Sequence, residues 1–207
     1  MSEYIIHGTS IDNLNKILKD KYIKIKPNKK NRMILNENNE QNINQIFTQL
    51  IFKNIPNGKY QYSHWFTHGI VLRKQILKDL PFYATKFGSF NMSFNDAMKR
   101  KDLLAKGDGN LKKYPDLKEL KTHIKNYVKK GKTSIDFIHS HEILFNQNIS
   151  LEKYCVCIIV KAHNEKFKII NNLKIPVIYR KISKKACTEG NINEIIDEIK
   201  KINKKYK

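Results

Sequence analysis

His7 is the first residue whose surroundings favour chemistry. It ends the strand-like segment 4–7 and is followed by Gly8 and Thr9, so an imidazole and a hydroxyl flank a residue without a side chain. Such a group is suited to hydrogen bonding with the hydroxyls of a sugar, because both side chains carry donors and acceptors. The alternative is a structural histidine that only caps the helix that follows.

Glu142 is the second candidate. It opens the apolar segment 142–145, whose other residues are suited to burial, and a buried carboxylate is costly without a partner. The alternative is a glutamate at a strand edge that faces water. Tyr83, within the strand-like segment 81–85, is a third candidate. If the three residues act together, their side chains must converge on one cleft.

Several enzyme signatures are missing from the sequence. It contains no GxxxxGK[ST], GxGxxG, GxSxG or HExxH motif, which argues against most nucleotide hydrolases and many hydrolytic enzymes. Cys155 and Cys157 alternate along a strand-like segment, Cys187 stands apart, and no CxxC motif or His/Cys cluster surrounds them. We therefore expect buried, reduced thiols and no metal site.

The elements that position these residues follow from apolar spacing. The spacing predicts helices at 11–20, 43–51, 117–128 and 192–202, and strands at 4–7, 22–26, 81–85, 142–145, 155–160, 167–170 and 175–179. Thr9 or Ser10 is placed to cap the first helix, segment 28–40 is predicted as a loop, and the tail 200–207 is expected to fray. Mixed short strands and amphipathic helices indicate an α+β fold.

The length favours one domain spanning 1–207. No apolar run approaches the length of a membrane span, and the N-terminus lacks the pattern of a signal peptide. We therefore expect an intracellular protein, cytoplasmic or nuclear, without a membrane partner.

The chain is strongly basic, with 40 Lys and Arg against 19 Asp and Glu and a net charge of +21. Segment 99–132 alone carries twelve Lys and Arg and four acids, a surplus of eight (12 − 4), partly on a predicted amphipathic helix. One interpretation is a surface for DNA, RNA or another polyanion, and the other is a solvated face that reflects a general bias toward lysine. Four aromatic residues nearby are suited either to stacking on unpaired bases or to the core: Phe82, Phe87, Phe90 and Phe94.

Taken together, the segments around His7, Tyr83 and Glu142 resemble the ADP-ribosyltransferase family. Segment 4–20, with its His-Gly-Thr string and leucine-bearing helix, is similar to the first strand and helix of the family. Segment 81–85 is similar to its middle strand, with an aromatic-Tyr pair before a small residue. Segment 140–154 is similar to its glutamate strand, with Ser140 in the place of the serine of an S-x-E pattern.

The resemblance implies a fold and a set of roles. The fold would be α+β, with a split, strongly bent antiparallel β-sheet core and flanking helices. NAD would be bound in the cleft as a substrate, without a metal. His7 would bind a ribose hydroxyl, Gly8 would contact the nicotinamide amide through its backbone, and Thr9 and Ser140 would lie in the NAD site.

The catalytic roles implied by the resemblance fall on Tyr83 and Glu142. Tyr83 would stack on the nicotinamide ring, and Glu142 would hydrogen-bond the 2′-hydroxyl of the nicotinamide ribose. Segment 86–134 would be a basic insertion that recruits the acceptor. Lys86 stands where the DNA-modifying branch carries an arginine, so the branch remains open.

We expect a mono-ADP-ribosyltransferase that releases nicotinamide and modifies a macromolecular acceptor, either a nucleic acid or a protein. Two alternatives remain. One is a basic nucleic-acid-binding protein without catalysis on the same scaffold, and the other is an NAD glycohydrolase in which water attacks the same sugar carbon.

Overall fold

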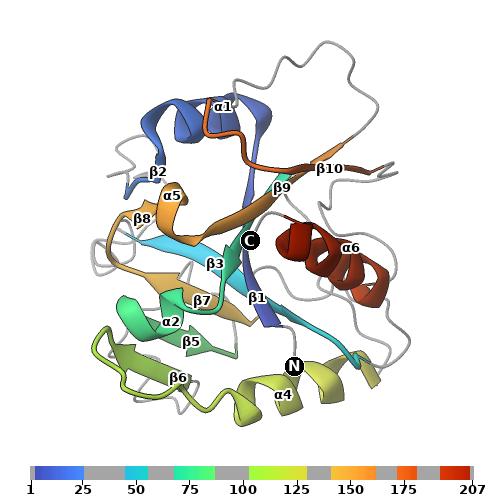
Figure 1. Cartoon of the computed structure of the whole chain (residues 1–207). Helices are drawn as coiled ribbons and strands as arrows, with labels where there is room; N and C mark the ends of the chain where they lie inside the picture. The colour runs from blue at the N-terminus through green and yellow to red at the C-terminus, as the bar shows by residue number, and fades with distance from the viewer. Residues whose placement is uncertain are drawn as a thin grey trace, which may run out of the picture.

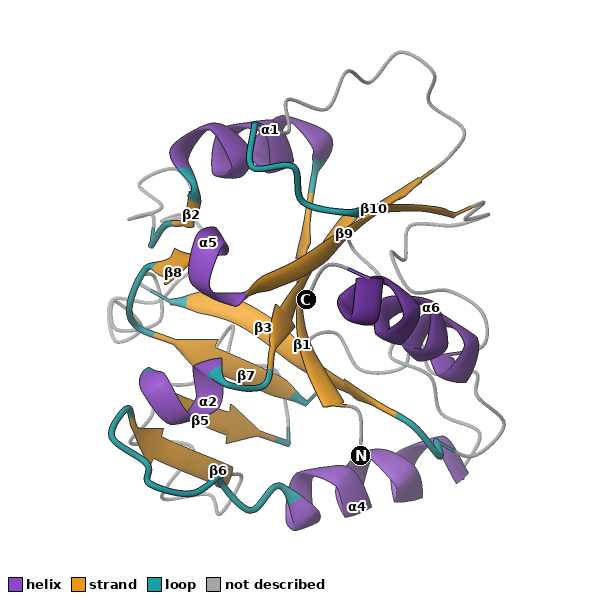
Figure 2. Ribbon diagram, viewed as in Figure 1, coloured by secondary structure: helices purple, strands orange, loops and turns teal. Residues whose placement is uncertain are grey.

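The computed structural model describes residues 3–25, 45–55, 68–86, 103–129, 141–161, 172–180 and 192–205. These residues form a mixed, largely antiparallel sheet with the strand order β10-β9-β4-β1-β3-β7-β5-β6 (Figures 1 and 2). The strands are β1 (Glu3–Thr9), β3 (Ile46–Phe52), β4 (His68–Arg73), β5 (Pro81–Thr85), β6 (Leu103–Asp108), β7 (Glu142–Phe145), β9 (Cys155–Lys161) and β10 (Val177–Arg180). A separate antiparallel pair joins β2 (Tyr22–Ile23) to β8 (Ile149–Ser150). The expected α+β class with an antiparallel sheet and flanking helices is confirmed at this level.

Helix α1 (Ile11–Asp20) has the predicted bounds. Ser10 caps it, because the Ser10 hydroxyl accepts a hydrogen bond from the backbone N–H of Asn13. Lys21 ends the helix in the left-handed conformation, with φ of 61°. The structural interpretation of His7 as the cap of this helix is therefore wrong.

The predicted helix at 43–51 is wrong, since its described residues belong to strand β3 and to Gln45 before it. β3 lies between β1 and β7 and has buried residues on both faces of the sheet. A strand with two apolar faces loses the strict alternation that marks most strands. Its apolar residues then imitate the spacing of a helix.

The remaining helices agree better with the sequence. Helix α4 (Lys118–Lys129) and helix α6 (Ile192–Lys205) bury the predicted apolar faces, and α6 extends through most of the tail that was expected to fray. Two single-turn helices were not predicted, α2 (Ile76–Asp79) and α5 (Leu151–Tyr154). The predicted strand at 22–26 shortens to β2, and the predictions at 28–40 and 167–170 fall outside the described residues.

The predicted insertion, 86–134, contains both β6 and α4. β6 pairs with β5 along the strand, so this part of the segment extends the sheet. Gly109, after β6, has a φ of +87° and lies against Pro81 at the start of β5. The chain thereby turns sharply over β5 before it enters α4.

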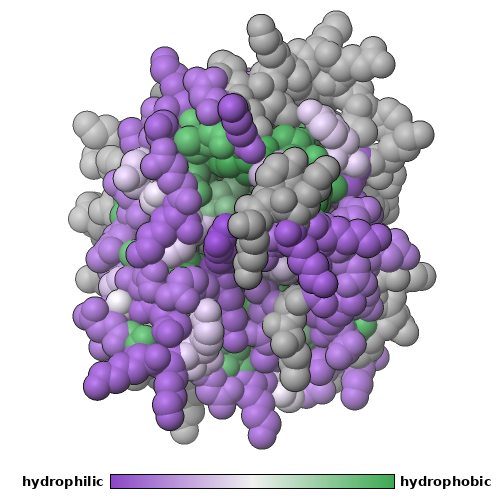
Figure 3. Space-filling view, in the orientation of Figure 1, coloured by the Kyte–Doolittle hydropathy of each residue, from purple (hydrophilic) through white to green (hydrophobic). Residues whose placement is uncertain are grey.

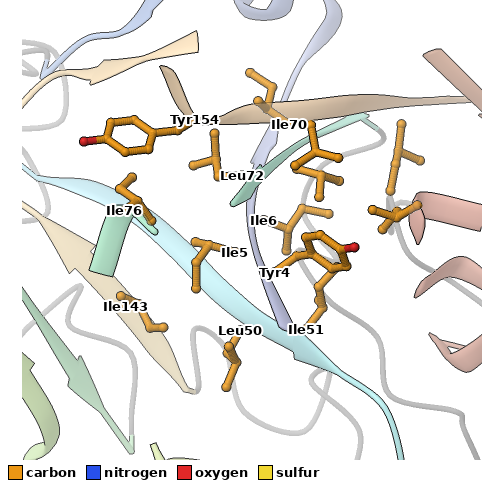
Figure 4. Packing of buried hydrophobic residues seen from close by; sticks show 14 of the residues in the cluster. Tyr4, Ile5, Ile6, Leu50, Ile51, Ile70, Leu72, Ile76, Ile143 and Tyr154 are labelled. Atoms are coloured by element: carbon orange, nitrogen blue, oxygen red, sulfur yellow. The ribbon is translucent and has the colours of Figure 1, made fainter. Parts of the chain in front are cut away.

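The core lies on both faces of the sheet. In Figure 4, Tyr4, Ile6 and Ile51 lie on one side of β1, whereas Ile5 and Leu50 lie on the other. Helix α6 packs against β3 and β9, and α2 lies against β5. Of the cysteines, Cys157 is buried and Cys155 half-buried, both are free thiols, and burial raises the pKa of Cys155 to about 12. Cys187 lies outside the described residues.

The sheet divides between β1 and β3. Their register runs from Glu3 opposite Phe52 to Ile6 opposite Gln49. Beyond this point β1 continues to pair with β4 as far as Thr9, whereas β3 pairs with β7. Figure 1 shows β3 crossing β1 at an angle and running away from it. We call this divergence the split, with β10-β9-β4-β1 on one side and β3-β7-β5-β6 on the other.

Within the described residues, no helix combines the length and apolar character that crossing a membrane requires.

Candidate functional site

His7 lies on β1 just past the last residue that pairs with β3. Its Nδ1 atom is 2.9 Å from the carbonyl oxygen of Phe47 on β3. A carbonyl only accepts, so Nδ1 carries the proton and Nε2 is left as an acceptor. Burial lowers the pKa of His7, and the bond to Phe47 opposes this only in part. The ring is therefore a neutral imidazole that bridges the start of the split.

Gly8 and Thr9 continue β1 along the split. Gly8 lies opposite Gly69 of β4, and Thr9 lies opposite His68. Two glycines face each other, so neither strand carries a side chain at this pair, and both glycines are buried. Thr9 and His68 are both buried, which adds a hydroxyl and a second imidazole next to His7.

Tyr83 lies across the split, on β5. Its hydroxyl donates a hydrogen bond to Oε1 of Gln45 over 2.8 Å, and the side chain is almost fully buried. Burial raises the pKa of Tyr83, the negative charge of Glu142 adds to this effect, and the bond to Gln45 opposes it. The phenol is neutral and its ring is held in one orientation.

Glu142 is the first residue of β7 and is only 4% exposed. The interpretation of Glu142 as a strand-edge residue facing water is therefore wrong. It pairs with Gln49 of β3, and one residue further the Thr48 hydroxyl donates to the Ile143 carbonyl over 2.7 Å. These contacts fix the start of β7 against β3.

The strand registers place Tyr83 and Glu142 on one face of the sheet. Tyr83 lies opposite Leu144, and Leu144 lies two residues after Glu142, so all three share a face. Tyr83 and Glu142 are diagonal neighbours on adjacent strands, a relationship that brings Cβ atoms to about 7–8 Å. The electrostatic interaction between these two residues agrees with this placement.

Strand alternation places His7 on the other face of the sheet. Ile6 pairs with Gln49, and Gln49 pairs with Glu142, so Ile6 lies on the face of Glu142. His7 is the next residue of β1 and therefore lies on the opposite face. Its ring instead contacts the backbone of Phe47, and Phe47 lies in the same row as Leu144 and Tyr83. Two strand spacings, about 10 Å, separate Phe47 from Tyr83 in that row. The structure thus brings Tyr83 and Glu142 together and sets His7 on the opposite side of the split.

The residue before Glu142 is also tied in place. His141 is buried and has a φ of 58°, a conformation that is uncommon for residues other than glycine. Its Nε2 lies 2.7 Å from Nδ1 of His123 on α4, and its backbone N–H donates to the carbonyl of Lys86. Burial lowers the pKa of His141 to about 3, with a further contribution from His123. Ser140, the other residue placed in the NAD site, lies outside the described residues.

Sequence reasoning missed several polar residues of this site. Gln45 and Gln49 accompany Tyr83 and Glu142, and His68 accompanies His7. The glutamines were hidden because their segment was predicted as a helix. If the segment had been interpreted as a strand, the alternation of Gln45, Phe47 and Gln49 would have placed both glutamines on the same face.

Among the described residues, no three metal-ligating side chains lie together as a group. No protein-family model, curated protein or solved structure matches the chain.

Proposed function

We propose that this protein is an NAD-dependent mono-ADP-ribosyltransferase with an ADP-ribosyltransferase-like fold. It would transfer ADP-ribose to a macromolecular acceptor, a nucleic acid or a protein, and release nicotinamide. The observation that carries the proposal is the split between β1 and β3, with a neutral imidazole on one side and the buried pair Tyr83 and Glu142 on the other. The resemblance of the three segments to the family points to the same residues.

Bond cleavage in this reaction creates positive charge on a sugar. The bond between C1′ of the ribose and the nicotinamide nitrogen breaks, and nicotinamide leaves with the electron pair. The ribose becomes oxocarbenium-like in the transition state, and a preorganised carboxylate stabilises such charge as it develops. Glu142, fixed at the start of β7 next to Gln49, would supply this carboxylate and hydrogen-bond the 2′-hydroxyl. The acceptor then forms a bond to C1′ and loses a proton.

The other residues would orient NAD. The ring of Tyr83, held by Gln45, would stack on nicotinamide. The backbone of Gly8 would bond the nicotinamide amide. His7 would accept a hydrogen bond from a ribose hydroxyl at Nε2, because its Nδ1 proton is engaged by Phe47. Thr9 lies beside His7 as a further donor.

The experiment compares nicotinamide release by three forms of the protein, with and without an oligonucleotide or protein acceptor. The first is the unaltered chain, the second Glu142→Gln, and the third Glu152→Gln as a control in which an exposed glutamate loses its ion pair with Lys21. Removing one electrostatic stabiliser typically costs at least about 100-fold in kcat, and we expect that loss for Glu142→Gln alone.

The outcomes separate the alternatives. Nicotinamide release without transfer to any acceptor would identify an NAD glycohydrolase. Neither nicotinamide release nor NAD binding by the unaltered chain would overturn the enzymatic proposal and favour a protein that only binds nucleic acid. Normal turnover by Glu142→Gln would remove the role assigned to Glu142.

A further inference from the structure

Tyr114 is an exposed aromatic residue held in a fixed position. It lies between β6 and α4 and is 51% exposed. Its hydroxyl donates a hydrogen bond to Oε1 of Gln75 over 3.0 Å. The Gln75 amide in turn donates to Asp79, which also accepts from Tyr154 of α5. A chain of side-chain bonds therefore anchors the exposed ring to two neighbouring helices.

Two lysines lie at this ring, and two more precede it in the chain. The ammonium groups of Lys74 and Lys78 lie 5.0 and 4.9 Å from the ring centroid, within the range of cation–π interactions. Lys112 and Lys113 precede Tyr114 in the chain and are exposed. Within the described part of the chain, neither of them forms an ion pair. We call these five residues the Tyr114 surface.

The Tyr114 surface combines the two kinds of contact that an unpaired nucleotide makes. An aromatic face stacks on any base, and lysines beside it bind the phosphates. An acidic peptide would engage the lysines but would leave the ring without a role. The rigid anchoring of Tyr114 also reduces the entropy lost when a partner binds. In Figure 3 the lower left of the molecule, where the segment between β6 and α4 lies in Figure 1, is mostly hydrophilic.

We propose that the Tyr114 surface binds single-stranded nucleic acid, with one base stacked on Tyr114 and adjacent phosphates on Lys112 and Lys113. A stacked base takes the place of Lys78 at the ring, and the ammonium of Lys78 moves to a phosphate, whereas Lys74 stays paired with Glu3. The role of this surface as the site for the acceptor depends on the proposed ADP-ribosyl transfer. Binding itself requires no NAD, so the two proposals are tested separately.

The experiment measures binding of a short fluorescent single-stranded oligonucleotide of mixed sequence to the full chain, without NAD, by anisotropy. Tyr114→Ala removes the ring, and Tyr114→Phe keeps the ring but removes the bond to Gln75. Tyr179→Ala is the matched control, because Tyr179 on β10 is also exposed (64%) and lies in a different part of the sheet. Thermal unfolding of each variant verifies that it is folded.

We expect Tyr114→Ala to weaken binding by about 5- to 150-fold, as loss of one base–aromatic stack does. Tyr114→Phe should stay within about threefold of the unaltered protein, and Tyr179→Ala should bind as the unaltered protein does. Replacing Lys112 and Lys113 together by Gln should lower the slope of log affinity against log salt by about 1.4, since each single-strand phosphate contact contributes about 0.7.

Three results would overturn this proposal. The first is equal binding by folded Tyr114→Ala and the unaltered protein. The second is an equal loss in Tyr179→Ala. The third is competition by poly-glutamate as effective as competition by the unlabelled oligonucleotide, which would assign the surface to an acidic peptide. Failure of the NAD chemistry would appear separately, as missing nicotinamide release with oligonucleotide binding intact.

Discussion

The imidazole of His7 donates a hydrogen bond from Nδ1 to the carbonyl oxygen of Phe47, over 2.9 Å, at the point where β1 and β3 stop pairing. A side chain thus continues a contact that the backbone no longer makes. The bond also fixes the roles of the two ring nitrogens, because Nδ1 donates to Phe47 and Nε2 remains the acceptor.

The two nitrogens of His7 can be separated by substitution. In His7→Asn the side-chain amide can replace Nδ1–H as the donor to Phe47, but nothing replaces Nε2. We expect His7→Asn to keep its stability and to bind NAD at least about tenfold more weakly, a loss of about 1.4 kcal/mol. His7→Ala should also lose about 1 kcal/mol of unfolding free energy, because the partly buried Phe47 carbonyl loses its donor. Urea unfolding and NAD titration measure the two effects, and equal NAD affinity in His7→Asn would contradict the role of Nε2.

The hydroxyl of Tyr83 should contribute to stability, and its ring should contribute to catalysis. Tyr83→Phe removes the bond to Gln45 and is expected to cost about 1 kcal/mol of stability. If the ring stacks on nicotinamide, Tyr83→Phe keeps most of its kcat, whereas Tyr83→Ala loses it. Nicotinamide release at several NAD concentrations gives kcat and KM for both. Gln45→Ala is a useful comparison because it removes the same hydrogen bond from the other side. Equal kcat for Tyr83→Phe and Tyr83→Ala would contradict stacking.

The buried histidine His141 should make the protein sensitive to mild acid. Its pKa is lowered to about 3, so below its ordinary value of 6.5 the unfolded state binds a proton that the folded state does not. The contribution of the neutral His141 to the free energy of unfolding is fully present above pH 6.5 and is lost as the pH falls. This residue alone gives a slope of about 1.4 kcal/mol per pH unit. The pKa of His7 is also lowered, and His7 adds a loss of the same sign.

A substitution isolates the contribution of His141 to the pH dependence of stability. His141→Asn removes the titrating group, and asparagine tolerates the φ of 58° at this position. Urea unfolding between neutral pH and mildly acidic pH should show a shallower pH dependence for this variant than for the unaltered protein. An unchanged slope would exclude His141 as its source.

Glu3 joins β1 to α4 through buried charge. Its carboxylate is 5% exposed and pairs with Lys74 and Lys121, both at 2.5 Å. Burial alone would raise the pKa of Glu3, but the bonds to Lys121 and Lys74 outweigh it and the pKa is lowered. The stabilisation is therefore present above pH 4.5 and is lost as the pH falls below it.

We expect Glu3→Gln to cost about 3 kcal/mol of unfolding free energy at neutral pH, because two partly buried lysines lose their counter-charge. Asp20→Asn is the control, since the exposed Asp20–Lys24 pair contributes at most about 0.5 kcal/mol. Chemical denaturation measures both values. A cost for Glu3→Gln as small as that of the control would show that these ion pairs add no net stability.

Local patterns in the sequence predicted local structure well. The apolar spacing after Ser10 predicted α1, the apolar run from Glu142 predicted β7, and the face containing Leu120 and Ile124 predicted α4. Each of these elements has one buried face or one continuous apolar run. The prediction for the β3 segment was wrong because both faces of this strand carry buried residues, so the apolar residues do not alternate with polar ones.

The arrangement of the candidate site was beyond local patterns. The contact between Tyr83 and Gln45 spans 38 residues, and the contact between His7 and Phe47 spans 40. Both depend on the strand order around β3, which no short segment encodes. The sequence singled out His7, Tyr83 and Glu142 as candidates for one site, but their positions on the two sides of the split came only from the strand registers.

The split also has a consequence for local unfolding. In the described structure β1 and β3 share backbone pairing only between Glu3 and Ile6, so the two parts of the sheet are joined by a short ladder and by the ring of His7. Leu50 and Ile51 pair with β1 through this short ladder, whereas Phe47 and Thr48 pair with β7. Opening of the split should therefore let the amide groups of Leu50 and Ile51 exchange hydrogen faster than those of Phe47 and Thr48 on the same strand. A ligand that contacts both His7 and Tyr83 would slow this exchange by joining the two parts, so hydrogen exchange at β3 reports occupancy of the split without any turnover.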